Sequence, residues 1–74
     1  MQRRGKFVLC IKNSGYQASL EVRKVYLRIR DAGADAHGFA RIVDESGEDY
    51  LYPEGHFVPI EVPPKAKLAF ASAE

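Results

Sequence analysis

The sequence predicts an all-β domain built as a small five-stranded barrel with a short C-terminal tail. Three observations support this fold class. Short segments alternate apolar with polar residues, β-branched and aromatic residues are concentrated in those segments, and Gly, Pro, Asn and Asp separate them. With 74 residues, the chain can bury one hydrophobic core and has no room for a second. We expect an N-terminal arm at residues 1–6, the barrel at 7–62 and the tail at 63–74.

The first predicted strand covers residues 6–12, and a loop follows it. Its apolar side chains fall on both faces, so we expect the strand to be covered on both sides. The Asn-Ser-Gly run at 13–15 ends the strand, because Asn and Gly tolerate the positive φ of a turn. Residues 16–23 follow no steady period and are predicted to form an irregular loop that leads into a short extended piece. Cys10 is expected to be a small buried side chain.

Residues 24–31 form the clearest strand of the first half. Val25, Leu27 and Ile29 alternate strictly with polar or aromatic residues and are predicted to face the core. The other face carries Tyr26, Arg28 and Arg30. This face is predicted to meet solvent or a partner, because two arginines cannot be buried without ionic partners. The small residues and glycines of 31–38 predict a loop, with His37 on its surface.

Residues 39–44 and 48–52 are predicted to form a hairpin. Gly47 can adopt the left-handed conformation that its short turn requires. Pro53 ends the return strand because proline has no N–H for a ladder. A Glu-Gly pair then separates this strand from the last one.

The last predicted strand covers residues 57–62, with Val58, Ile60 and Val62 on one face. Pro59 marks it as an edge strand or the end of a ladder. In the tail we expect about one helical turn, packed by Leu68 and Phe70.

The charge of the chain is balanced overall but divided between its halves. Net charge is +1, yet residues 1–30 hold eight basic side chains against one acidic, and residues 31–74 hold three against nine. This division indicates either a nucleic-acid face or opposite charges on neighbouring strands. In a small barrel the two halves pair with each other, so the second interpretation is favoured.

The sequence contains little that indicates an enzyme. Four carboxylates, Asp44, Glu45, Glu48 and Asp49, flank the predicted hairpin turn, where we expect solvent to surround them. One cysteine and two distant histidines are too few for a zinc site, and no phosphate-binding glycine loop or nucleophile motif is present. We therefore expect no catalytic residue, no metal and no cofactor. The lack of a secretion signal and of a long apolar run predicts a cytoplasmic protein.

Two segments resemble parts of an SH3 domain. Leu-Glu-Val-Arg-Lys-Val-Tyr-Leu-Arg-Ile at 20–29 resembles its diverging turn and second strand. Gly-Glu-Asp-Tyr-Leu-Tyr-Pro-Glu-Gly-His-Phe-Val at 47–58 resembles its ending, in which a hairpin precedes a proline, a one-turn 3₁₀ helix and an aromatic residue. Over most of 7–62 the chain is thus similar to SH3-like barrels, including small bacterial proteins of that fold.

The resemblance implies a groove for a protein or peptide partner, at Tyr52 or Pro53 and Phe57, with Tyr16 contributed by the first long loop. Together with the outward Tyr26, these residues form the predicted protein-binding surface of a small adaptor or accessory subunit. A structural alternative is that Tyr50, Tyr52 and Phe57 only fill the ends of the barrel.

A rival hypothesis is a nucleic-acid surface on the second strand. It would use Lys24, Tyr26, Arg28 and Arg30, supported by Arg3, Arg4 and Lys6 of the arm. A homodimer is a further expectation, through an edge strand at residues 57–62 or 7–11.

Overall fold

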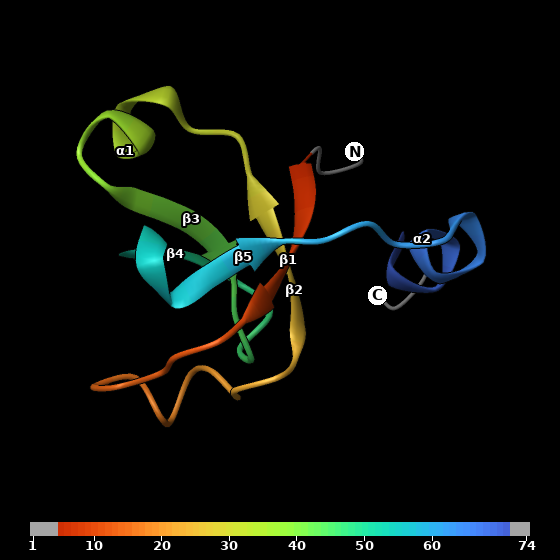
Figure 1. The fold of residues 1–74 in the computed structure, drawn as a ribbon, viewed down its shortest axis with the longest axis horizontal. Coiled ribbons are helices and arrows are strands. Elements are labelled where there is room, and N and C mark those ends of the chain that lie inside the picture. The colour runs from red at the N-terminus through yellow and green to blue at the C-terminus, as the bar shows by residue number, and fades with distance from the viewer. Residues whose placement is uncertain (1–4, 72–74) are drawn as a thin grey trace.

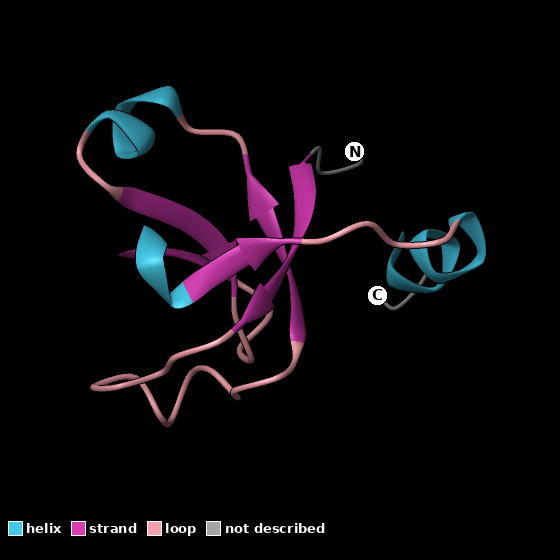
Figure 2. Cartoon of the chain, viewed as in Figure 1, coloured by secondary structure: helices cyan, strands magenta, loops and turns pink. Residues whose placement is uncertain are grey.

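The computed structural model describes residues 5–71 and shows a small all-β fold. Five antiparallel strands form one sheet in the order β4-β3-β2-β1-β5, curled into a half-barrel (Figure 1). Its elements in chain order are β1 (Gly5–Cys10), β2 (Val25–Ile29), α1 (Ala32–Ala36), β3 (Phe39–Val43), β4 (Asp49–Pro53), the 3₁₀ helix η1 (Glu54–His56), β5 (Phe57–Pro59) and α2 (Pro64–Ala71). Figure 2 shows that the loop between β1 and β2 lies at one end of the sheet, and that a second connection leads from β5 away to α2.

The predicted strands are all present, whereas two predicted non-strand segments differ. Residues 31–38 contain the short helix α1, because the Asp31 carboxylate accepts a hydrogen bond from the Ala34 N–H and caps its first turn. The tail contains α2, which is longer than the single turn expected and lies to one side of the sheet (Figure 1). Leu68 is 69% exposed, and the side chain of Phe70 lies outside the described part. Neither helix within residues 5–71 has the length or apolar character needed to cross a membrane.

The core lies on the inner face of the curled sheet. Leu20 of the first loop closes one end of it. The buried side chains of this core are Val8, Cys10, Leu20, Tyr26, Ala40, Ile42, Tyr52 and Phe57. The expected burial of Cys10 is confirmed. Tyr52 and Phe57 therefore belong to the core, whereas Tyr50, the third ring of the structural alternative, is 50% exposed.

The prediction for the faces of residues 24–31 is wrong. Tyr26 lies on the inner face and is only 4% exposed, while Val25, Leu27 and Ile29 are half-buried on the outer face. Arg28 also turns inward, and its guanidinium meets Asp35 at 2.6 Å and Glu54 at 2.9 Å. Strict alternation defines two faces but does not say which is inside. The inner position is possible because both polar side chains find partners there.

Strand order also decides which strands are edges. β1 lies between β2 and β5, so the expectation that residues 7–11 form an edge strand is wrong. The two edges of the sheet are β4 and β5. β5 ends at Pro59, earlier than predicted, and the Ile60 N–H makes one further hydrogen bond to the Phe7 carbonyl at 3.1 Å.

The same substitution, Val→Ala, can be made on each face of the sheet to compare how much each face contributes to stability. Val8 is buried on the inner face and Val25 is half-buried on the outer face of the neighbouring strand. Val8→Ala should lower the free energy of unfolding by about 2 kcal/mol, because a cavity adds to the lost burial. Val25→Ala should lower the free energy of unfolding by about 1 kcal/mol or less, because a half-buried side chain loses less burial. Urea denaturation of both variants measures this, and a larger loss for Val25→Ala would contradict the assignment of faces.

Candidate functional site

The loop at residues 11–24 is held in one shape by its own hydrogen bonds. The Asn13 side-chain amide donates to the Leu20 carbonyl at 3.0 Å, and the Tyr16 N–H donates to the Asn13 carbonyl at 2.8 Å. Because Leu20 is anchored in the core, the loop is held against the sheet. This arrangement brings Tyr16 beside β4, although the two are far apart in the sequence.

The hairpin turn between β3 and β4 forms as predicted. Gly47 has a φ of +85°, and the Asp44 carboxylate accepts from the Ser46 N–H at 2.9 Å and from the Ser46 hydroxyl at 2.6 Å. The expectation that solvent surrounds all four acids of the turn is wrong for Asp44. This residue is buried, because Tyr52 and Ser46 supply the hydrogen bonds that its carboxylate would otherwise take from water.

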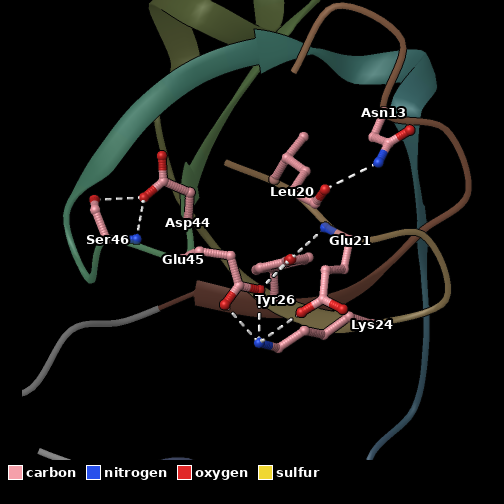
Figure 3. Close-up of polar contacts among 8 residues, drawn as sticks. All are labelled: Asn13, Leu20, Glu21, Lys24, Tyr26, Asp44, Glu45 and Ser46. Atoms are coloured by element: carbon pink, nitrogen blue, oxygen red, sulfur yellow. Dashed lines mark hydrogen bonds and ion pairs between the residues drawn. The ribbon is translucent and has the colours of Figure 1, made fainter. Parts of the chain in front are cut away.

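Two buried tyrosines donate to neighbouring carboxylates of this turn. The Tyr26 hydroxyl donates to Glu45 Oε2 at 2.5 Å, and the Tyr52 hydroxyl donates to Asp44 Oδ2 at 2.5 Å. Figure 3 shows Lys24 completing the first pair, with its Nζ 2.6 Å from Glu45 Oε2. The Glu21 N–H also donates to the Tyr26 hydroxyl oxygen at 2.7 Å. The turn, the loop and the core are therefore joined by one hydrogen-bond network.

The network shifts the pKa values of its members. Burial, followed by the hydrogen bond to Glu45, raises the pKa of Tyr26 far above its usual value. The bonds from Lys24 and Tyr26 hold the pKa of Glu45 below its usual value. Burial alone would raise the pKa of Asp44, but the bonds from Ser46 and Tyr52 outweigh it, so that this pKa is lowered. At neutral pH both carboxylates are thus ionised and both hydroxyls stay protonated.

An open groove of about 440 Å³ lies beside this network. Its lining residues are Tyr16, Ser19, Asp44, Ser46, Tyr50, Leu51 and Tyr52. The Tyr16 ring packs edge-on against the Tyr52 ring with centroids 5.0 Å apart. The three consecutive β4 residues point alternately to opposite faces, so a groove that touches all of them runs along the free edge of that strand.

The structure brings together two of the five residues predicted for a protein-binding surface. Tyr16 and Tyr52 line the groove. Tyr26 and Phe57 belong to the core, and Pro53 lies opposite Phe39 at the end of β4. Tyr50 and Leu51 were missed. Their alternation marked them as strand residues, but only the strand order shows that they lie on a free edge.

The rival basic surface is not assembled as predicted. Tyr26 is buried, Arg28 is ion-paired with Asp35 and Glu54, and Lys24 is ion-paired with Glu45. Arg30 is exposed, as expected. Arg3 and Arg4 lie outside the described residues.

His56 is a buried polar residue that the sequence did not single out. Its ring lies 5.7 Å from the Tyr16 ring, and its Nδ1 has no hydrogen-bond partner within residues 5–71. In the same part of the chain, no three side chains of His, Cys, Asp or Glu cluster closely enough to hold a metal ion.

Comparison with known proteins finds no matching family model, no matching curated protein and no matching solved structure.

The bond between Tyr26 and Glu45 can be tested against an exposed tyrosine. Tyr26→Phe should lower the free energy of unfolding by about 1–3 kcal/mol, because it leaves the Glu21 N–H without a partner and removes one of the hydrogen bonds to the Glu45 carboxylate in a half-buried site. Tyr50 is 50% exposed, so Tyr50→Phe should change stability by about 0.5 kcal/mol or less. Equal losses in chemical denaturation would contradict the role assigned to the buried hydroxyl.

The lowered pKa values of Asp44 and Glu45 predict a defined acid sensitivity. The unfolded chain binds these protons near pH 4, whereas the folded protein binds them only at lower pH. The stabilisation is therefore complete above about pH 5 and is lost as the pH falls through the folded pKa values. Denaturation at pH 3 to 6 should show this slope in the wild type and a flatter profile in Asp44→Asn plus Glu45→Gln. Glu61→Gln is the control and should keep the wild-type slope.

Proposed function

We propose that the protein is a small non-enzymatic binding module of the SH3-like type that holds a segment of a protein partner in the groove beside β4. The main support for this proposal is that Tyr16 and Tyr52 pack together in this groove, with Tyr50 and Leu51 exposed next to them. Tyrosine rings combine a large apolar surface with a hydroxyl, and such side chains dominate binding energies at protein interfaces.

The groove is formed before any partner arrives, which supports binding over a purely structural role. Tyr52 is fixed by its bond to Asp44, and the loop that carries Tyr16 is fixed by Asn13 and Leu20. A preformed site loses little side-chain and loop entropy on binding, so more of the contact energy appears as affinity.

The chemistry of the groove also supports a binding role over acid–base catalysis. The lowered pKa of Asp44 makes this carboxylate a weak base at neutral pH. Burial raises the pKa of the Cys10 thiol, which is enclosed in the core and is therefore a poor nucleophile. A single free cysteine suits a reducing compartment, and the proposal includes a cytoplasmic location.

A displayed library of random dodecapeptides tests the proposal. Peptides selected on the wild-type protein should lose about 10-fold or more in affinity for Leu51→Ala, because an exposed groove leucine is removed. Leu68→Ala removes the same side chain from α2, outside the groove lining, and should change affinity by less than about 2-fold.

Equal binding to both variants, or failure to select any peptide, would overturn the assignment. A labelled single-stranded oligonucleotide is titrated in parallel at low salt. Binding that weakens steeply with salt and is reduced by Arg30→Ala would favour the nucleic-acid alternative instead.

A further inference from the structure

The β4 edge of the sheet carries backbone groups that no neighbouring strand uses. The Glu54 N–H donates to the Gly38 carbonyl, and the Asp44 N–H donates to the Glu48 carbonyl. Along β4, even-numbered residues therefore bond to β3, and odd-numbered residues turn their backbone groups outward. The free edge presents the N–H and C=O groups of Asp49 and Leu51.

The β5 edge, by contrast, is closed. Hydrogen bonds from the Ile11 N–H to the His56 carbonyl and from the Ile60 N–H to the Phe7 carbonyl show that even-numbered residues of this edge face β1. Of the outward residues, Phe57 donates its N–H to the Glu54 carbonyl, and Pro59 has no N–H. Within residues 5–71, strand addition through backbone donors is thus possible at β4 and not at β5.

Side chains on both sides of the β4 edge can hold an added strand. Tyr50 and Tyr52 lie on the inner side with Tyr16, forming the groove. Leu51 lies on the outer side with Phe39, and these two side chains are 45% and 41% exposed. A strand placed here would set alternate side chains against a tyrosine surface and an aliphatic and aromatic surface.

The groove has a negative character. Among the described residues its lining contains Asp44 and no lysine or arginine, and Glu48 reaches it through the Tyr50 hydroxyl, which donates to Glu48 Oε1 at 3.1 Å. Tyrosine faces and carboxylates both attract cations. Side chains that enter this groove from an added strand should therefore be basic.

We infer that the partner segment is extended, alternates basic with apolar residues, and joins the sheet along β4 as a sixth strand. Its basic side chains lie over the tyrosines near Glu48, and its apolar side chains cover Leu51 and Phe39. This inference rests on the proposed function and specifies how the same groove is used. Backbone pairing supplies the affinity, and the alternating side chains supply the selectivity.

A fluorescent nine-residue peptide that alternates lysine and valine is the probe, and the same peptide with glutamate in place of lysine is its control. The lysine peptide should bind the full chain at least 10-fold more tightly than the glutamate peptide. Glu48→Gln should weaken the lysine peptide by 3-fold or more, whereas Glu61→Gln should not. Equal binding of the two peptides, or no binding of the lysine peptide, would overturn the basic character of the segment.

N-methylation of alternate peptide amides tests the strand pairing directly. In an added strand, the N–H groups of every second residue point toward β4. Methylation of these amides should therefore abolish binding, and methylation of the intervening amides should preserve it. Amide exchange of Leu51 and Asp49 should slow by 10-fold or more in the complex. If both methylated peptides bind, and these two amides exchange unchanged, no strand is added. In that event, loss of binding in Leu51→Ala would still support the groove and the proposed function.

The remaining alternative is that a second copy of this chain, and not a separate partner, pairs with the β4 edge. Sedimentation velocity of the wild type and Leu51→Ala should show monomers at all concentrations. Concentration-dependent dimers that Leu51→Ala disrupts would show that a second copy occupies the edge, and would overturn the assignment to a separate partner.

Discussion

The fold depends on two tyrosine hydroxyls that are buried together with their carboxylate partners. Tyr26 and Tyr52 rise from the inner face of the sheet and donate to Glu45 and Asp44, which are adjacent in one turn. A buried hydroxyl without a partner costs about 1–3 kcal/mol, so neither ring could occupy the core alone. The turn therefore has to lie over this end of the half-barrel. Its position in turn fixes the first loop, because the Glu45 N–H donates to the Ser19 carbonyl.

Local signals predicted the strands and turns well. Alternation located the strands, Gly47 located the hairpin reversal, and the resemblance to SH3 domains predicted the 3₁₀ turn after Pro53. The inner face of residues 24–31 could not be predicted in this way. Tyr26 and Arg28 are tolerated inside only because Glu45 and Glu54 reach them from 19 and 26 residues away. Such pairs become visible only when the chain has been folded.

Only part of the candidate groove could be predicted from the sequence, because the rest of it also depends on how distant segments pair. Tyr16 and Tyr52 were named from the resemblance, and the structure places their rings in contact. Tyr50 and Leu51 carry no local mark that separates a groove residue from an ordinary strand residue. Their significance comes from the position of β4 at the end of the strand order, which depends on how all five strands pair. A site built on a sheet edge is therefore harder to find from sequence than one built on a motif.

Because of Pro59, the described sheet can accept a further strand through backbone donors at the β4 edge and not at the β5 edge. Head-to-tail assembly of identical copies into a filament needs two compatible edges on each copy, one to accept and one to continue. In the part of the chain that the structure describes, the β5 edge lacks the donors for continuation, so any pairing that β4 accepts ends with that single event. An exposed tyrosine-rich edge is ordinarily a hazard for amyloid-like polymerisation. In this chain one proline limits that hazard while leaving the other edge available.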